Sequence, residues 1–209
     1  MVLLEYPAEA CVMAMMEDSW INTRYHLGTI SQPDVDPMKV RPLDPTDARA
    51  YQRLRLLALQ ESPTAFSASH ADEAGRTIDE VATRITPAAD GSICTLGIFE
   101  GDELVGFVAV IHPQREKVRH CAELAGMYVA PTFRRRGFGS ALLEGAVAHA
   151  RSIAGVRQIK LGVNATNAEA RALYQSIGFA SYGVEPDALQ VDGTFYGEER
   201  YVLRLDHPA

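Results

Sequence analysis

Apolar residues recur along the chain first at helical spacing, from about residue 40 to residue 90. Tyr51, Leu54 and Ala58 form one helical stripe, and Asp44-Pro45 before them supplies an N-cap and a proline suited to a first turn. The elements expected here are a strand over residues 39–43, a helix that carries the stripe, and a second helix over residues 78–85.

From residue 92 the pattern becomes that of strands. Two apolar runs, 93–99 and 104–111, flank the turn-forming residues 100–103, and a third run covers 121–129. These three runs predict an antiparallel sheet, after which helical and strand patterns alternate. The later elements expected are helices over 137–152 and 167–177, and strands over 158–163, 179–184 and 195–205, the last after the hairpin turn Asp192-Gly193.

Residues 1–37 show no sustained period and end in a turn-rich stretch over residues 31–37. We therefore expect them to be an N-terminal extension outside the core fold, with residues 38–207 forming the folded domain. An upstream extension and a start codon assigned too early would both give this pattern. The apolar opening carries Glu5 and Glu9 and has no basic region before it, which is unlike a signal peptide.

Composition narrows the classes of partner. The formal net charge of -7 argues against nucleic acid, because phosphate contacts need clustered lysine and arginine. No apolar run reaches the length of a membrane span, so we expect a cytoplasmic protein without a membrane partner. The three cysteines are scattered, and His112 and His120 lack a third ligand, so we expect free thiols and no metal site.

A basic, glycine-containing turn stands out against this acidic background. Residues 134–140 read Arg-Arg-Arg-Gly-Phe-Gly-Ser, and they follow a strand and open a helix. Glycines let a phosphate approach the backbone, the helix start offers unpaired N–H groups, and arginine adds charge. This pattern is typical of a pyrophosphate site, although a basic surface loop would also produce it. The spacing fits neither a Rossmann fingerprint nor a P-loop.

A second motif lies on the helix expected over residues 167–177. Thr166 and Glu169 have the spacing of a capping box, which predicts a helix start at Asn167, and Gly178 suits the position after its end. Asn167, Ala170 and Tyr174 would then share one face, with an amide near the helix start and a phenol two turns on. A tyrosine on such a stripe is also a common core residue.

Together the two motifs resemble the GNAT superfamily of acetyl-CoA-dependent N-acetyltransferases. The shared features are an arginine-glycine turn opening one helix, a strand, and an N-x-x-A-x-x-x-Y helix that closes on Gly178-Phe179. The strand over residues 122–131, the opening residues 41–48 and the late segment 185–193 also resemble members of the family. The resemblance covers the chain from about residue 38 to its C-terminus, and it is most specific in the middle.

The resemblance implies an α/β (α+β) fold with a largely antiparallel central sheet, two splayed parallel strands and flanking helices. Acetyl-CoA would enter between the strands that end at Val129 and Val163, and would be the acyl donor without a metal. Tyr174 would protonate the leaving thiolate. The residues implied to bind the cofactor are Met127, Tyr128, Val129, Arg134, Arg135, Arg136, Gly137, Phe138, Gly139, Ser140, Asn167, Ala170 and Tyr174.

The family also suggests a general base and an acceptor region. Histone-acetylating members carry a glutamate on the same strand at the position of Glu123, although an alternating strand would also turn Glu123 to solvent. Members that acetylate protein N-termini often carry an acidic residue where this chain has Gly162, which disfavours a protein acceptor. The acceptor is expected near Phe66 and the hairpin residues Phe195 and Tyr196.

The function expected from the resemblance is transfer of an acetyl group from acetyl-CoA to a primary amine of a small molecule. Acidic residues of the 187–199 segment would suit a cationic acceptor, or would simply be solvated carboxylates on a hairpin. The alternatives are a protein or peptide N-acetyltransferase and a non-catalytic sensor that binds acyl-CoA. Dimers are common in the family, so a homodimer is an open alternative to a monomer.

Overall fold

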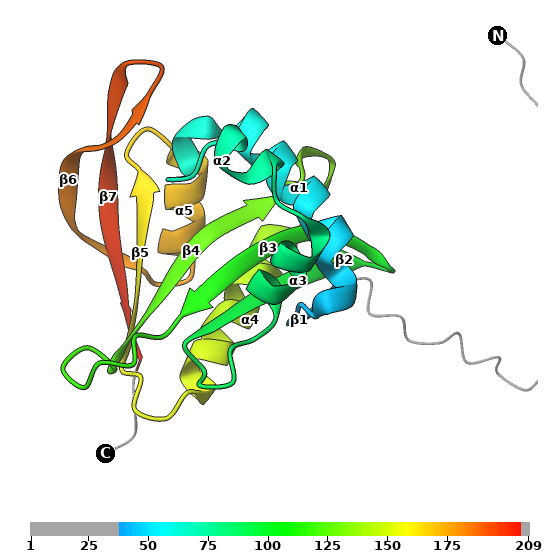
Figure 1. The fold of residues 1–209 in the computed structure, drawn as a ribbon. Coiled ribbons are helices and arrows are strands. Elements are labelled where there is room, and N and C mark those ends of the chain that lie inside the picture. Colours follow the sequence, from blue (N-terminus) through cyan, green and yellow to red (C-terminus); the bar gives the residue numbers. More distant parts are fainter. Residues whose placement is uncertain (1–37, 206–209) are drawn as a thin grey trace, which may run out of the picture. The chain divides into compact units, whose positions relative to one another are not determined.

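The computed structural model describes residues 38–205, and the expectations for residues 1–37, Cys11 and the domain end at residue 207 concern residues outside this range. The described chain contains seven strands and five α-helices (Figure 1). They follow in the order β1 (Met38–Pro42), α1 (Ala48–Glu61), α2 (His70–Ala74), α3 (Ile78–Ile85), β2 (Ile93–Glu100), β3 (Glu103–Ile111), β4 (Cys121–Val129), α4 (Phe138–Ser152), β5 (Gln158–Asn164), α5 (Ala168–Ser176), β6 (Ala180–Val191) and β7 (Thr194–Arg204).

All seven strands form one sheet in the order β1-β2-β3-β4-β5-β7-β6. Neighbouring strands are antiparallel except β4 and β5, which are parallel. The expected mixed sheet with one parallel pair is therefore confirmed. Both predicted hairpin turns are present, and Asp192 and Gly193 adopt the positive φ angles of 49° and 78° that their turn requires.

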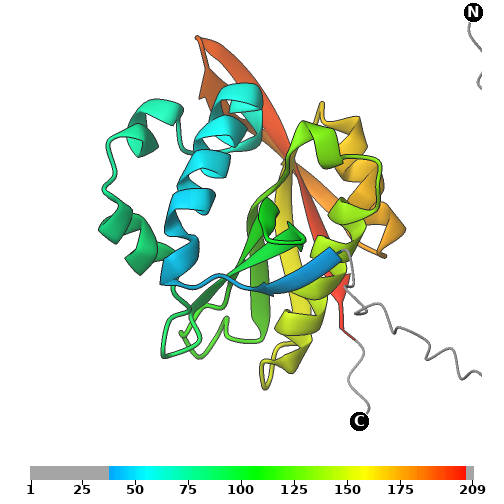
Figure 2. The ribbon, with the colours of Figure 1, turned by 90° about the vertical axis from the view of Figure 1, so that its right-hand side faces the viewer.

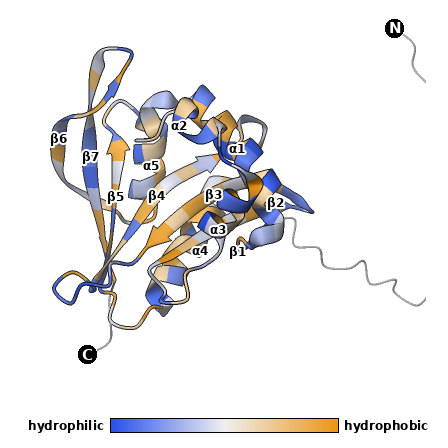
Figure 3. Ribbon diagram, viewed as in Figure 1, coloured by the Kyte–Doolittle hydropathy of each residue, from blue (hydrophilic) through white to orange (hydrophobic). Residues whose placement is uncertain are grey.

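Helices cover both faces of this sheet (Figure 2). The helices α1, α2 and α3 lie on one face, where the stripe residues Tyr51, Leu54 and Ala58 are buried against Phe107 and Leu104 of β3. The helices α4 and α5 lie on the other face. β2 and β3, which run between the two layers, are largely apolar (Figure 3). Each face therefore has its own hydrophobic core.

Two elements differ from the sequence-based expectation. The segment after Phe66, expected as a loop, contains the five-residue helix α2, which starts with a capping box between Ser69 and Asp72. The strand expected to end at residue 184 continues to Val191 as β6, because its pairing with β7 resumes after a register shift between Glu185 and Leu189. Asp187 adopts a φ of 52° inside that shift, which interrupts the alternating pattern that a strand prediction needs.

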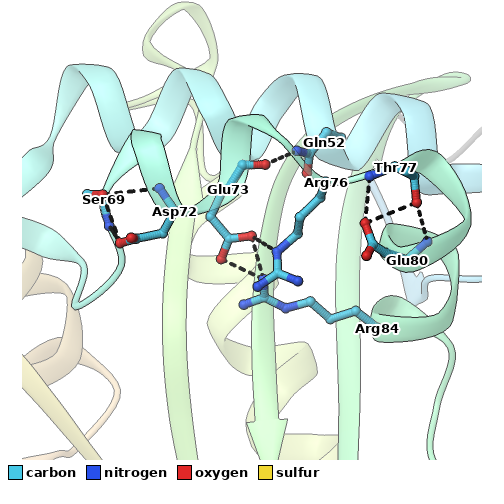
Figure 4. A network of polar contacts seen from close by, with 8 residues as sticks. All are labelled: Gln52, Ser69, Asp72, Glu73, Arg76, Thr77, Glu80 and Arg84. Atoms are coloured by element: carbon cyan, nitrogen blue, oxygen red, sulfur yellow. Dashed lines mark hydrogen bonds and ion pairs between the residues drawn. The ribbon is translucent and has the colours of Figure 1, made fainter.

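A buried carboxylate joins α2 to α3. Glu73 is 3% exposed, and its carboxylate accepts hydrogen bonds from Arg76 Nε at 2.6 Å and from Arg84 Nη1 at 2.6 and 2.7 Å (Figure 4). Gln52 of α1 donates to the Glu73 carbonyl oxygen at 2.7 Å. Burial alone would raise the pKa of Glu73, but the two arginines outweigh it and hold that pKa below the ordinary glutamate value.

Replacing Glu73 by glutamine is expected to lower the free energy of unfolding at about pH 7 by about 3 kcal/mol, because two arginines lose a buried partner. The pKa of Glu73 is lower in the folded state, so the unfolded state binds its proton first and the contribution fades on acidification. Urea titrations at about pH 7 and about pH 3 measure both effects. Glu144→Gln on the exposed surface of α4 is the control. Equal stability of the parent and Glu73→Gln at neutral pH would contradict this account.

Candidate active site

The parallel strands β4 and β5 stay together for only a short distance. Their pairing runs from Cys121↔Gln158 to Glu123↔Lys160, whereas β4 continues to Val129 and β5 to Asn164. Gly126, with a φ of 63°, lies at a bulge where β3 residues 107–109 face β4 residues 125–128. The two strands therefore separate and leave an opening in the middle of the sheet.

A cavity of about 470 Å³, cavity A, lies at this opening on the side of α4 and α5. Its walls come from the end of β4, the turn before α4, the first two turns of α5 and the segment after α1. The lining residues are Ser62, Ala65, Phe66, Met127, Tyr128, Val129, Arg134, Arg135, Gly137, Gly139, Ser140, Asn167, Glu169, Ala170, Leu173 and Tyr174. A volume of this size is typical of a site for a small molecule or cofactor.

The start of α4 forms one end of cavity A. Gly137 is the N-cap with a φ of 89°, and Arg135 before it has a φ of 56°. Because glycine has no side chain, it supplies no cap for the first N–H groups of the 15-residue helix. Unpaired N–H groups and the positive end of a helix dipole make this end of the cavity suitable for an anion.

The three arginines of the turn have different surroundings. Arg134 donates from Nη1 and Nη2 to the Glu61 carboxylate at 2.8 and 2.6 Å, and from Nε to the Val129 carbonyl oxygen at 2.9 Å. Arg136 pairs with Glu100 and its guanidinium lies 5.3 Å from the Phe133 and Phe138 ring centroids. Arg135 is exposed and lines cavity A.

These surroundings change what each arginine can offer to an anion. Arg134 lines the cavity with its guanidinium already engaged, and its partner Glu61 also accepts a bond of 2.7 Å from the Tyr128 hydroxyl. The side chains of Arg136 and the buried Phe138 lie outside the lining of cavity A. Among the described residues, no hydrogen bond or ion pair occupies the guanidinium of Arg135.

The start of α5 differs from the predicted capping box. The N-cap is Asn167 and not Thr166, because Asn167 Oδ1 accepts a hydrogen bond of 3.0 Å from the Ala170 N–H. The Thr166 hydroxyl and N–H instead donate to Asn164 Oδ1, at 2.7 and 2.9 Å. The capping-box prediction was therefore wrong by one residue, since an asparagine competes well for the N-cap position. Gly178 follows the helix with a φ of 98°, as predicted.

The hydroxyl of Tyr174 points toward β4. The side chain is 8% exposed, and among the described residues its hydroxyl contacts only Met127 Sδ, at 3.9 Å. A thioether is a weak acceptor, so this buried donor is poorly satisfied by the protein. Burial raises the pKa of Tyr174 to about 12, so the phenol stays protonated at neutral pH.

A second cavity of about 430 Å³, cavity B, lies on the side of α1. Glu123 lines it and does not line cavity A, so the structure places Glu123 and Tyr174 in neighbouring cavities. Ala65 and Phe66 belong to the walls of both. The lining residues of cavity B are Tyr51, Arg55, Ala65, Phe66, Ser67, Arg84, Ile93, Thr95, Phe107, Ala109, Ile111, Glu123, Leu124, Ala125, Gly126, Gly162, Ala188, Leu189, Glu198 and Arg200.

Two residues expected near the acceptor lie outside both described cavities. Phe195 is 58% exposed, and Tyr196 is half-buried opposite Leu189 in the β6–β7 pair. The same hairpin contributes Leu189, Glu198 and Arg200 to cavity B instead. Glu198 belongs to the acidic segment that the sequence suggested for the acceptor. Sequence reasoning missed Leu189, Arg200, Arg55 and Gly126, because no local motif distinguishes them.

Within residues 38–205 no group of three or more histidine, cysteine or acidic side chains is placed to hold a metal ion. The described helices are too short or too polar to cross a membrane. Cys94 and Cys121 are buried free thiols.

Known proteins share both the sequence pattern and the fold. Residues 54–179 match the acetyltransferase (GNAT) family. A mycothiol acetyltransferase of Segniliparus rotundus is 33% identical over 112 residues, which cover 53% of this chain and 42% of that protein, so the match spans less than half of the relative's length.

Solved structures give the same result for the fold. An acetyltransferase of the GNAT family from Streptococcus pneumoniae has a TM-score of 0.69 at 25% identity, covering 80% of this chain and 99% of that one. The protein yncA from Salmonella typhimurium, solved with its cofactor acetyl-CoA, has a TM-score of 0.70 at 22% identity, covering 83% and 96%. The chain thus belongs to the acetyltransferase (GNAT) family.

Proposed function

We propose that the protein transfers the acetyl group of acetyl-CoA to the primary amine of a small molecule, with the donor in cavity A and the acceptor in cavity B. The observation that carries this assignment is the pair of cavities that share the wall Ala65–Phe66 beside the separated strands β4 and β5. Each cavity has the volume of a small-molecule site. We also propose residues 38–207 as the acetyltransferase domain, with residues 1–37 outside it.

In cavity A the two ends of acetyl-CoA would meet different groups. The pyrophosphate would bind the N–H groups between Arg135 and Ser140 at the start of α4, together with the Arg135 side chain. The pantetheine arm would pair with the backbone of residues 127–129, which β5 leaves uncovered, much as a peptide adds to a sheet edge. Asn167 would hold this arm through its free amide N–H group, beside Ala170.

The reaction is a direct acyl transfer. The amine nitrogen attacks the thioester carbonyl carbon, a C–N bond forms, and a tetrahedral intermediate with an oxyanion results. A backbone N–H group of residues 127–129 would donate to that oxyanion. When the C–S bond breaks, the CoA sulfur leaves as a thiolate and takes the proton of Tyr174. The hydroxyl of Tyr174 supports this role, because it stays protonated at neutral pH and donates only to a weak acceptor, Met127 Sδ, among the described residues.

The attacking amine must first lose a proton, and Glu123 is the proposed base. Glu123 lies on β4 in cavity B, on the acceptor side of the opening. An amine arrives as ammonium at neutral pH, so a base at this position raises the fraction that can attack, either directly or through one water molecule.

Replacing Glu123 by glutamine is expected to lower kcat/KM most at low pH, by about 100-fold, and less as the pH rises. The reason is that the free amine becomes abundant without a base at high pH. Rates measured with a responsive amine from about pH 6 to about pH 10 give the profile. Glu103→Gln, an exposed glutamate at the start of β3, is the control. A Glu123→Gln profile parallel to that of the parent would exclude Glu123 as the base.

A panel of amines tests the function itself. The full chain is incubated with acetyl-CoA and, separately, with amino acids, polyamines, aminoglycosides and peptides, and CoA release and acetylated product are both measured. We expect product with a small-molecule amine, in line with a relative that is named a mycothiol acetyltransferase. Product with peptides alone would make the protein a peptide N-acetyltransferase. Acetyl-CoA binding by calorimetry with no product would make it a sensor.

A further inference from the structure

Cavity B contains a buried cation, Arg55, that has no carboxylate partner among the described residues. Arg55 of α1 is 6% exposed and lines the cavity. Its Nε is enclosed and makes no hydrogen bond, and no ion pair involves its guanidinium among the described residues. Burial lowers the pKa of Arg55, yet an arginine keeps its charge in proteins at neutral pH. A buried charge is normally paired, so the missing partner indicates a ligand.

Two carboxylates near Arg55 are engaged with other cations, and Glu123, which also lines cavity B, makes no ion pair with Arg55 among the described residues. The Glu73 carboxylate binds Arg76 and Arg84 (Figure 4), and the Glu198 carboxylate lies 3.3 Å from Arg200 Nη1. Glu73 thus has two cations of its own and does not bond to Arg55. Within residues 38–205, no carboxylate forms an ion pair with the guanidinium of Arg55.

The guanidinium of Arg55 also lies beside two aromatic rings. Its central carbon lies 4.6 Å from the centroid of the Phe66 ring and 6.0 Å from that of Phe107. Stacking on a ring occupies the face of a guanidinium and leaves the N–H groups at its edge for a planar acceptor. A Cβ at Gly126 would be in van der Waals contact with Arg55 Nη1, at 3.6 Å, so the glycine leaves the space beside this nitrogen unfilled.

We propose that the acceptor carries a carboxylate, which Arg55 binds through two parallel hydrogen bonds, and that the amine lies toward Glu123 and the opening in the sheet. This rests on the proposed function, which places the acceptor in cavity B. A molecule that carries both a carboxylate and an ammonium group is a zwitterion. The substrate class is therefore an amino acid or a small amino-acid derivative with a free carboxylate, and a cavity of about 430 Å³ has room for it.

Pairs of substrates with and without the carboxylate test this proposal. L-amino acids and the amines formed by their decarboxylation, such as phenylalanine with phenethylamine and lysine with cadaverine, are offered to the full-length parent, Arg55→Met and Arg55→Lys. Arg53→Gln, an exposed arginine on the same helix, is the matched control. Product formation gives kcat and KM, and calorimetry gives the acetyl-CoA affinity of each variant.

The parent and Arg53→Gln are expected to prefer the carboxylate-bearing member of a pair by at least about 10-fold in kcat/KM. Arg55→Met should lose this preference, mainly through KM, while acetylating the decarboxylated amine as the parent does and keeping its acetyl-CoA affinity. Arg55→Lys should keep part of the preference and serves as the readout if Arg55→Met does not fold. A purely structural role would instead lower the melting temperature and affect both members of a pair alike.

Two failures are distinguishable. Acetylation of amines by the parent without any preference for a carboxylate, or a preference that survives in Arg55→Met, overturns the role of Arg55 and leaves the proposed function intact. Acetyl-CoA binding without acetylation of any amine in the panel overturns the proposed function, and the zwitterionic acceptor with it.

Discussion

Tyr174→Phe is expected to turn over about 100-fold more slowly than the parent, with acetyl-CoA affinity changed by less than about 2-fold. The substitution keeps the ring, which packs against Phe179 and Tyr201 at centroid distances of 6.0 and 6.4 Å, and removes only the hydroxyl that faces Met127. The thiolate then leaves without its proton donor. Single-turnover rates and calorimetry with acetyl-CoA separate the chemical step from binding.

Tyr201→Phe is the matched control for this experiment. Tyr201 is a fully buried phenol next to Tyr174, but its hydroxyl accepts hydrogen bonds from Arg171 and Gln175 and it lies outside the lining of cavity A. Its loss should affect stability and leave turnover nearly unchanged. If Tyr174→Phe matches the parent on a responsive amine, Tyr174 is a packing residue and water protonates the thiolate.

Gly137→Val is expected to weaken acetyl-CoA binding by about 100-fold, since it alters the helix start that would hold the pyrophosphate. Gly137 has a φ of 89°, which a β-branched residue adopts only with strain, and its side chain would stand beside the N–H groups of Phe138 and Gly139. A Cβ at this position would lie 3.9 Å from Met38 Cε, its nearest neighbour. Steric overlap of the Cβ with the core therefore does not contribute to the expected loss of affinity. Calorimetry at two salt concentrations measures the loss and its electrostatic part.

Gly155→Val is the control that separates the effect of backbone strain from an effect on the proposed donor site. Gly155 has a similar φ of 84°, and a Cβ there would meet nothing within 4 Å. Both variants should lose similar stability, on the order of 1–3 kcal/mol, while only Gly137→Val should lose affinity. Unchanged acetyl-CoA affinity in Gly137→Val would remove the turn from the donor site.

The parts of the fold that depend on local spacing were predictable from the sequence. The stripe of Tyr51, Leu54 and Ala58, the hairpin at Asp192-Gly193 and the glycine after α5 each need only a few consecutive residues. The N-cap of α5 was misplaced by one residue because Thr166 and Asn167 are both good caps. Hydrogen bonds from Thr166 to the Asn164 side chain, two residues earlier, leave Asn167 as the cap.

The partners of charged groups could not be predicted in the same way. Arg134 and Glu61 are 73 residues apart in the sequence, and Arg136 and Glu100 are 36 apart, so no short motif connects them. Three adjacent arginines look equivalent in a sequence, whereas the fold engages two of them and leaves Arg135 at cavity A. No local pattern distinguishes Arg55 from the other arginines of its helix, and its guanidinium lies near the rings of Phe66 and Phe107, which come from other elements.

The shared wall of Ala65 and Phe66 has a thermodynamic consequence. Asn164 Nδ2 donates to the Thr64 carbonyl oxygen at 3.1 Å, so the segment that carries this wall is tied to the end of β5. A ligand in one cavity that shifts this wall changes the volume of the other cavity. Linkage then requires reciprocity: whatever factor the acceptor imposes on the affinity for acetyl-CoA, acetyl-CoA imposes on the affinity for the acceptor.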